Sequence, residues 1–84
     1  MTVARDLFLV WHGANAVDVT LDEPNHSLKP NLLLIRTTRT RSKLYHSIKR
    51  QLPDGTALLV APLADAPKFK GMAPGSLTWL ERGA

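Results

Sequence analysis

The side chains best suited to chemistry in this sequence are basic, and most of them lie in one short segment. Six bases occur within fifteen residues that contain no acid: Arg36, Arg39, Arg41, Lys43, Lys49 and Arg50. A run of this kind produces a positive field that attracts phosphate groups or an acidic protein surface. The segment therefore predicts a binding surface.

Helical spacing gathers part of this charge into a stripe. If residues 40–52 are helical, Lys43, His46 and Arg50 lie on the side opposite the apolar face. Such a stripe can follow a phosphate backbone, and binding would then weaken with salt. We therefore predict nucleic-acid binding by eight residues: Arg36, Arg39, Lys43, His46, Lys49, Arg50, Lys68 and Lys70. Two other interpretations stay open, a solvated face that keeps the protein soluble and a contact surface for an acidic protein.

Lys68 and Lys70 belong to this prediction because Phe69 stands between them. A phosphate can lie on the two bases while a nucleobase stacks on the ring. In the alternative interpretation Phe69 packs into the core and the two lysines simply face water.

Three histidines, His12, His26 and His46, are the remaining candidates for acid–base or metal chemistry. They form no His-x-x-x-His pair, and only His12 has acidic residues, Asp18 and Asp22, that a fold can bring beside it. The sequence also lacks cysteine, a Gly-x-Ser-x-Gly motif and a Walker phosphate loop. We expect His12 to be hydrogen-bonded at the end of a strand, and we expect no catalytic residue, metal or cofactor.

The first half of the chain predicts two strands and a loop. Residues 6–11 form an apolar run without alternation, which predicts a strand that is central in its sheet. Residues 16–21 alternate between apolar and polar types and predict a half-exposed second strand. Two prolines and several turn formers in residues 22–30 predict a loop.

A strand–helix–strand unit occupies the middle of the chain. Apolar runs at 31–36 and 56–61 predict its strands. The helix between them has Thr38 or Thr40 as its cap and stops near Leu52, because the proline that follows disfavours helical geometry. A crossover of this length predicts that the two strands are parallel.

The end of the chain is richer in proline and glycine. Residues 74–83 predict a short helix that Leu77, Trp79 and Leu80 would anchor. A short edge strand over residues 77–81 is the alternative.

Length and composition set the fold class. The chain has 84 residues, of which 44% are hydrophobic, so we expect one domain over residues 1–84. We predict an α+β fold, ferredoxin-like or a related two-layer sandwich. It should have three to five strands, one main amphipathic helix at about 40–52 and a short C-terminal helix or edge strand.

The absence of cysteine and of an apolar run approaching the ~20 residues of a membrane span predicts a cytoplasmic protein without membrane contact. If Phe8, Val10, Leu33 and Ile35 project away from the main helix, a second subunit or the tail must cover them. We therefore expect a homodimer.

Residues 32–83 resemble the C-terminal half of the small ferredoxin-like dimers related to the CRISPR adaptation subunit, and of their SinR-like relatives. The resemblance lies in five segments: Leu33-Leu-Ile-Arg-Thr37, Leu44-Tyr45 with Ile48, Ala57-Leu-Leu-Val-Ala61, Lys68-Phe-Lys-Gly71 and Trp79-Leu80. It implies a ferredoxin-like dimer. Members that cut nucleic acid have a metal-binding acid at the end of the first strand, where this chain has Trp11 and His12, so the resemblance does not imply a nuclease.

The sequence thus predicts a small, non-catalytic binding module that contacts nucleic acid through a basic helix face. A protein-interaction or regulatory subunit is the second hypothesis. A small metal-dependent or phosphoryl-transfer enzyme is the third.

Overall fold

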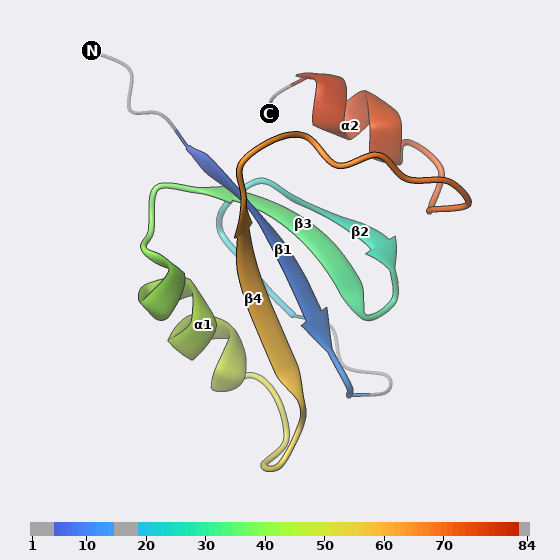
Figure 1. Cartoon of the computed structure of the whole chain (residues 1–84). Helices are drawn as coiled ribbons and strands as arrows, with labels where there is room; N and C mark the ends of the chain where they lie inside the picture. The colour runs from blue at the N-terminus through green and yellow to red at the C-terminus, as the bar shows by residue number, and fades with distance from the viewer. Residues whose placement is uncertain (1–4, 15–18, 83–84) are drawn as a thin grey trace.

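The computed structural model describes residues 5–14 and 19–82, which form a four-stranded sheet with one helix on each face. The elements are β1 (Asp6–His12), β2 (Asn25–Lys29), β3 (Leu32–Thr37), α1 (Arg41–Lys49), β4 (Leu58–Leu63) and α2 (Ser76–Arg82). The strand order is β2-β3-β1-β4, and every neighbouring pair is antiparallel (Figure 1). The predicted α+β class is confirmed.

The predicted strand–helix–strand unit is β3, α1 and β4. Both strands run antiparallel to β1, so they are parallel to each other, as predicted. They are not neighbours, because β1 lies between them. The apolar run at the start of the chain therefore forms a central strand, which explains why it lacks alternation.

Helix α1 begins where the sequence predicts and ends earlier. The side chain of Thr40 accepts a hydrogen bond from the backbone N–H of Lys43 (3.2 Å) and caps the helix. The backbone N–H groups of Gln51 and Leu52 bond three residues back, to Ile48 and Lys49, so the chain tightens into a turn. The α-helix therefore stops at Lys49 rather than at Leu52.

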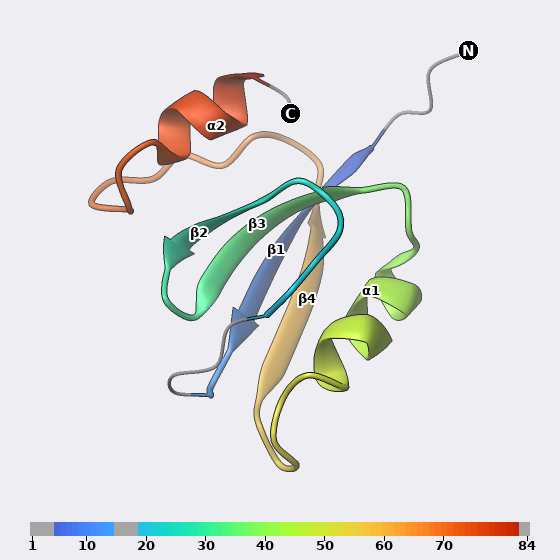
Figure 2. The ribbon, with the colours of Figure 1, turned by 180° about the vertical axis from the view of Figure 1, so that it is seen from behind.

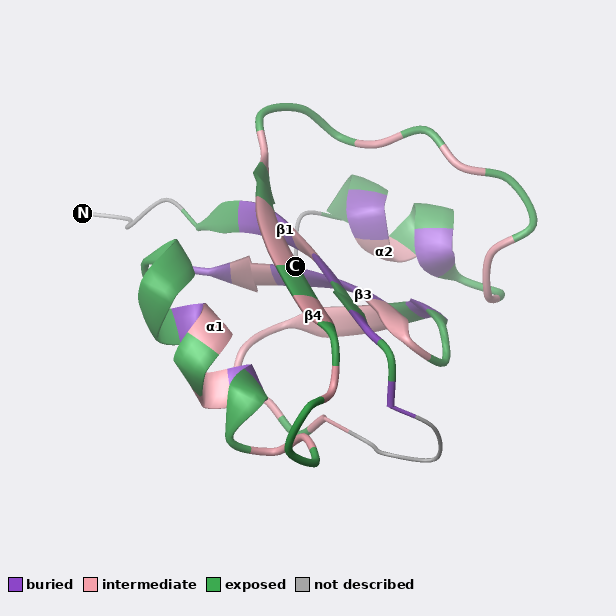
Figure 3. Cartoon of the chain, turned by 60° about the horizontal axis from the view of Figure 1, so that its bottom comes forward, coloured by how far each residue is buried: buried purple, intermediate pink, exposed green. Residues whose placement is uncertain are grey.

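The core on the α1 side consists of β1, β3 and α1 side chains. Phe8, Val10, Leu33, Ile35, Leu44 and Ile48 are all buried there. The strand residues that prompted the homodimer prediction therefore lie under α1, not opposite it. The solvent side of α1 is exposed, as Figure 3 shows by colour.

A second, smaller core lies on the other face of the sheet. Leu7, Leu28 and Leu34 meet Leu80 of α2, with Phe69 and Met72 packed at the margin. The two helices consequently lie on opposite sides of the sheet (Figure 2).

The prediction of a loop over residues 22–30 is wrong for its second half, because Asn25–Lys29 forms strand β2. This strand pairs with β3 through a tight turn at Pro30 and Asn31, with Lys29 opposite Leu32. The register shifts between Ser27 and Lys29, and this bulge accompanies the burial of Leu28 in the second core. Pairing with β3 thus overrides the local turn preference.

Three smaller differences concern two predicted strands and one side chain of the C-terminal helix. Of the predicted strand at 16–21, residues 16–18 lie outside the described part, and 19–21 are not a strand. β4 begins and ends two residues later than predicted and contains Pro62, which an edge strand tolerates. The C-terminal segment is a helix, but Leu77 does not anchor it, since this side chain is 58% exposed.

Candidate nucleic-acid interface

One flank of α1 brings four of the predicted residues together. Arg39, Lys43, His46 and Arg50 line a shallow depression of about 460 Å³, together with the hydroxyl-bearing Ser42 and Ser47. Within residues 5–14 and 19–82, the only ion pair joins Arg39 to Glu23. Lys43 and Arg50 therefore carry charge that no described carboxylate neutralises. We call Arg39, Lys43, His46 and Arg50 the basic flank.

Arg39 is the fixed member of the basic flank. Its Nε lies 3.1 Å from Oε1 of Glu23, and its Nη1 donates to Oγ of Ser47 (3.3 Å). The buried Thr37 connects the same groups, because its hydroxyl donates to Glu23 and accepts from the backbone N–H of Arg39. Arg39 thus contributes to the fold as well as to the charge, and part of its charge is neutralised.

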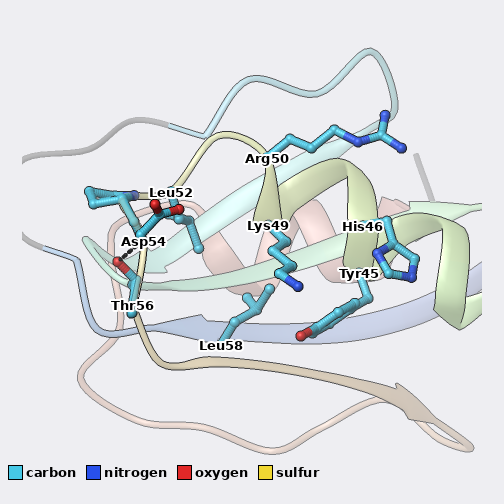
Figure 4. A pocket seen from close by; sticks show the side chains of 10 residues that line it. Tyr45, His46, Lys49, Arg50, Leu52, Asp54, Thr56 and Leu58 are labelled. Carbon is cyan, nitrogen blue, oxygen red and sulfur yellow. Dashed lines mark hydrogen bonds between the residues drawn. The ribbon is translucent and has the colours of Figure 1, made fainter.

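Lys49 lies on the other flank of α1. Its ammonium is 5.9 Å from the centre of the Tyr45 ring, within cation–π range. In Figure 4 the side chains of Lys49 and Tyr45 extend toward Leu58 of β4, while the side chain of Arg50 extends away from them. Lys49 therefore faces a different surface from Lys43.

Arg36 is separated from the basic flank by the sheet itself. It precedes Thr37 on β3, and alternation along the strand directs the two side chains to opposite faces. Arg36 lies over the ring of Trp79 (5.4 Å to its centre) and donates to the carbonyl of Leu80 (2.8 Å). The structure therefore uses Arg36 to hold α2, although the sequence places it in the basic run.

Lys68 and Lys70 lie on the segment that connects β4 to α2, and both are exposed. Phe69 packs against the core on the α2 side, as the second interpretation of this triplet predicted. Its ring is therefore partly buried, and these lysines do not share a depression with the basic flank.

The histidines occupy three unrelated environments. His12 is 1% exposed, and its Nδ1 accepts a bond from the backbone N–H of Ala14 (3.3 Å), so it is a hydrogen-bonded strand-end residue as predicted. His26 bonds to Ser76, and His46 lies on the basic flank. Among residues 5–14 and 19–82, no three His, Asp or Glu side chains come together in a way that would hold a metal ion, and Asp18 lies outside them.

Sequence reasoning missed the role of Gln51. Its side-chain Oε1 accepts from the backbone N–H of Thr20 (2.7 Å), and its Nε2 donates to the Thr20 carbonyl (2.9 Å). This pair ties the chain before β2 to the end of α1, where Val19 and Leu21 extend the core. No sequence pattern indicates a contact between residues this far apart.

Comparison with known proteins adds no relative: no family model, curated protein or solved structure matches this chain. Neither helix of the described residues has the length and apolar character that a bilayer crossing requires.

Proposed function

We propose that this protein is a small, non-catalytic module that binds nucleic acid through the basic flank of α1. The observation that carries the proposal is the shared depression lined by Arg39, Lys43, His46 and Arg50. Its charge is largely free of carboxylate partners among the described residues. Charge presented in this way attracts phosphate before any contact forms.

The composition of the flank suits backbone contacts better than base recognition. Lys43 and Arg50 offer donors to phosphate oxygens, and Ser42 and Ser47 add hydroxyls of the kind that often bond to phosphate. The adjacent aromatic ring, Tyr45, is half-buried and turned edge-on to His46. We therefore expect binding with little sequence preference and a strong dependence on salt.

The test is the double variant Lys43→Gln with Arg50→Gln. Both positions are exposed and make no described ion pair, so the fold should be unaffected, whereas replacing Arg39 would also break its contacts with Glu23. We expect weaker binding to every duplex and single-stranded probe. The salt slope should fall by about 0.9 for each lost phosphate contact on duplex DNA and ~0.7 on single strands.

The matched control is Lys68→Gln with Lys70→Gln, which removes the same charge from a different surface. It should change binding much less. Equal losses from both variants would mean that net charge acts without a site. A wild-type chain that shows no salt-dependent binding at ~50 mM salt would refute the function itself.

We also propose a ferredoxin-like fold in which the described residues lack the first of the usual two helices. Support comes from the order β2-β3-β1-β4, the antiparallel pairs and the crossover through α1. A ferredoxin-like fold has a further helix after its first strand. Here the described residues between β1 and β2 contain none.

A homodimer and a cytoplasmic location also remain proposals. An exposed apolar pair favours the dimer: Trp11 is 42% exposed, Leu59 is 53% exposed, and the two are opposite each other on β1 and β4. They lie on the sheet face that α2 covers only in part. Light scattering at micromolar concentration should give about twice the chain mass, and a monomer would refute this proposal.

A further inference from the structure

The outer edge of β4 presents main-chain groups that no residue within 5–14 and 19–82 binds. β4 is the last strand of the sheet, and the backbone N–H of Gly13 donates to the Ala57 carbonyl (2.9 Å) just beyond the β1–β4 pairing. Main-chain groups of an antiparallel strand alternate in direction. Ala57, Leu59 and Ala61 therefore bond inward to β1, while the N–H and C=O groups of Leu58 and Val60 point outward.

Beside this edge lies a groove bounded by α1. Two adjoining hollows of about 380 and 410 Å³ both include Tyr45 and Leu58 in their linings. Leu58, Val60 and Tyr45 form an apolar floor, and Arg41, Lys49 and Arg50 stand on the helix side. Asp54 is the one acid in the two linings. Figure 4 shows Lys49 and Tyr45 extending from the helix toward Leu58 across this groove. We call it the edge groove.

We infer that the edge groove binds an extended acidic segment of another protein, which adds to β4 as a fifth strand. The outward groups of Leu58 and Val60 would supply main-chain hydrogen bonds, as in other cases of strand addition. Arg41 and Lys49 make no ion pair with the described carboxylates, so they are available to the segment's acidic side chains.

Side chains of an added strand would point alternately to the two faces of the sheet, and this indicates which residue types the segment contains. Side chains on the α1 side would meet Arg41, Tyr45 and Lys49, so acids with an aliphatic stem fit there. Side chains on the opposite side would lie beside the exposed Leu59, so apolar residues fit there. The segment therefore alternates between acidic and apolar residues.

Charge disfavours a second copy of this chain at the same edge. Pairing two β4 strands about a two-fold axis would bring two α1 rims together on one face, each with Arg41 and Lys49. Like charges placed this way repel. Pro62 lacks an N–H, so the ladder ends after Val60 and the added strand is short.

The test uses a labelled peptide of about ten residues that alternates Glu and Val, with binding followed by fluorescence anisotropy. Val60→Pro removes the outward N–H, as Pro62 does naturally, and should weaken binding by about tenfold or more. Val60→Thr keeps the N–H and should bind as the wild type does. A peptide N-methylated on its β4-facing amides should lose binding to the same degree, and it decides the question if Val60→Pro does not fold.

Charge variants place the peptide on one flank. Arg41→Gln with Lys49→Gln should weaken binding several-fold at low salt. Lys43→Gln with Lys68→Gln removes the same charge from exposed positions that line neither hollow, and it should leave binding within about twofold. Equal losses from both pairs would mean that net charge acts without the edge groove and would overturn the inference. Equal binding of a peptide that alternates Lys and Val would also overturn it.

Two further outcomes would refute the edge groove as a peptide site. Unchanged peptide binding by Val60→Pro would exclude strand addition. A wild-type dimer that Val60→Pro converts to a monomer would show that a second copy occupies the edge. The inference does not depend on nucleic-acid binding, because Val60→Pro changes β4 and leaves every residue of the basic flank in place.

Discussion

The two faces of the sheet are covered in different ways. On one face, α1 contributes Leu44 and Ile48 to a core whose buried members are all apolar and at most 4% exposed. On the other face, α2 contributes one buried apolar side chain, Leu80, and the partly buried Trp79, and hydrogen bonds from His26 and Arg36 add to this packing. Apolar burial therefore contributes more to the packing of α1, and polar contacts contribute more to the packing of α2.

Those bonds form a small cluster around Trp79. Ser76 donates to the Ala73 carbonyl (2.6 Å), so the 2.8 Å bond to His26 must use the Nε2–H of the imidazole as donor. The Trp79 ring stacks on His26 (5.9 Å between ring centres) and lies under the guanidinium of Arg36. We therefore expect α2 to detach at lower free energy than α1, without unfolding the sheet.

The largest effect should come from the α1 core. Ile48→Ala and Leu44→Ala should each lower the free energy of unfolding by roughly 3 kcal/mol, because both side chains are fully buried and truncation leaves a cavity. Chemical denaturation followed by circular dichroism measures this. Losses below about 0.5 kcal/mol in both variants would mean that α1 does not pack as described.

Leu80→Ala should lower the free energy of unfolding by a smaller amount, about 2 kcal/mol, and its effect should be confined to α2. Hydrogen exchange should become faster in residues 76–82 while β1 and β3 stay protected. Leu77→Ala on the same helix is the control and should be nearly neutral, since this side chain is largely exposed. Equal loss of protection in α2 and in the central strands would show that the two faces unfold together.

The smallest effect should come from Ser76→Ala, which leaves the imidazole of His26 without its partner and costs about 1 kcal/mol. The emission of Trp79, recorded in a Trp11→Phe background, should shift to the red as α2 loosens. His26→Phe keeps an aromatic ring beside Trp79 but removes the bond, and it should produce part of the same shift. If neither variant changes the emission, the polar cluster around Trp79 does not hold α2 in place.

The same contrast explains what the sequence could predict. The central strand, β3, α1 and β4 were accessible because contiguous apolar runs and helical periodicity report burial directly. β2 was missed because its residues prefer turns, and only pairing with β3 makes them a strand. The sequence also could not predict that the basic residues lie on different faces. Arg36 and Arg39 are close in sequence, but strand alternation and the contact with Trp79 place Arg36 on the opposite face of the sheet. Contacts such as His26 with Ser76 join residues 50 positions apart, and no local pattern encodes them.

Pro62 has a consequence for the behaviour of the protein at high concentration. An open strand edge is a template on which identical chains can stack into fibres, and long apolar edges do so readily. β4 is apolar and lies at the edge, yet its proline leaves only Leu58 and Val60 with outward donors. We expect these two donors to limit any pairing along this edge to a short stretch. Replacing Pro62 should add a third outward donor and make stacking between copies of the chain easier.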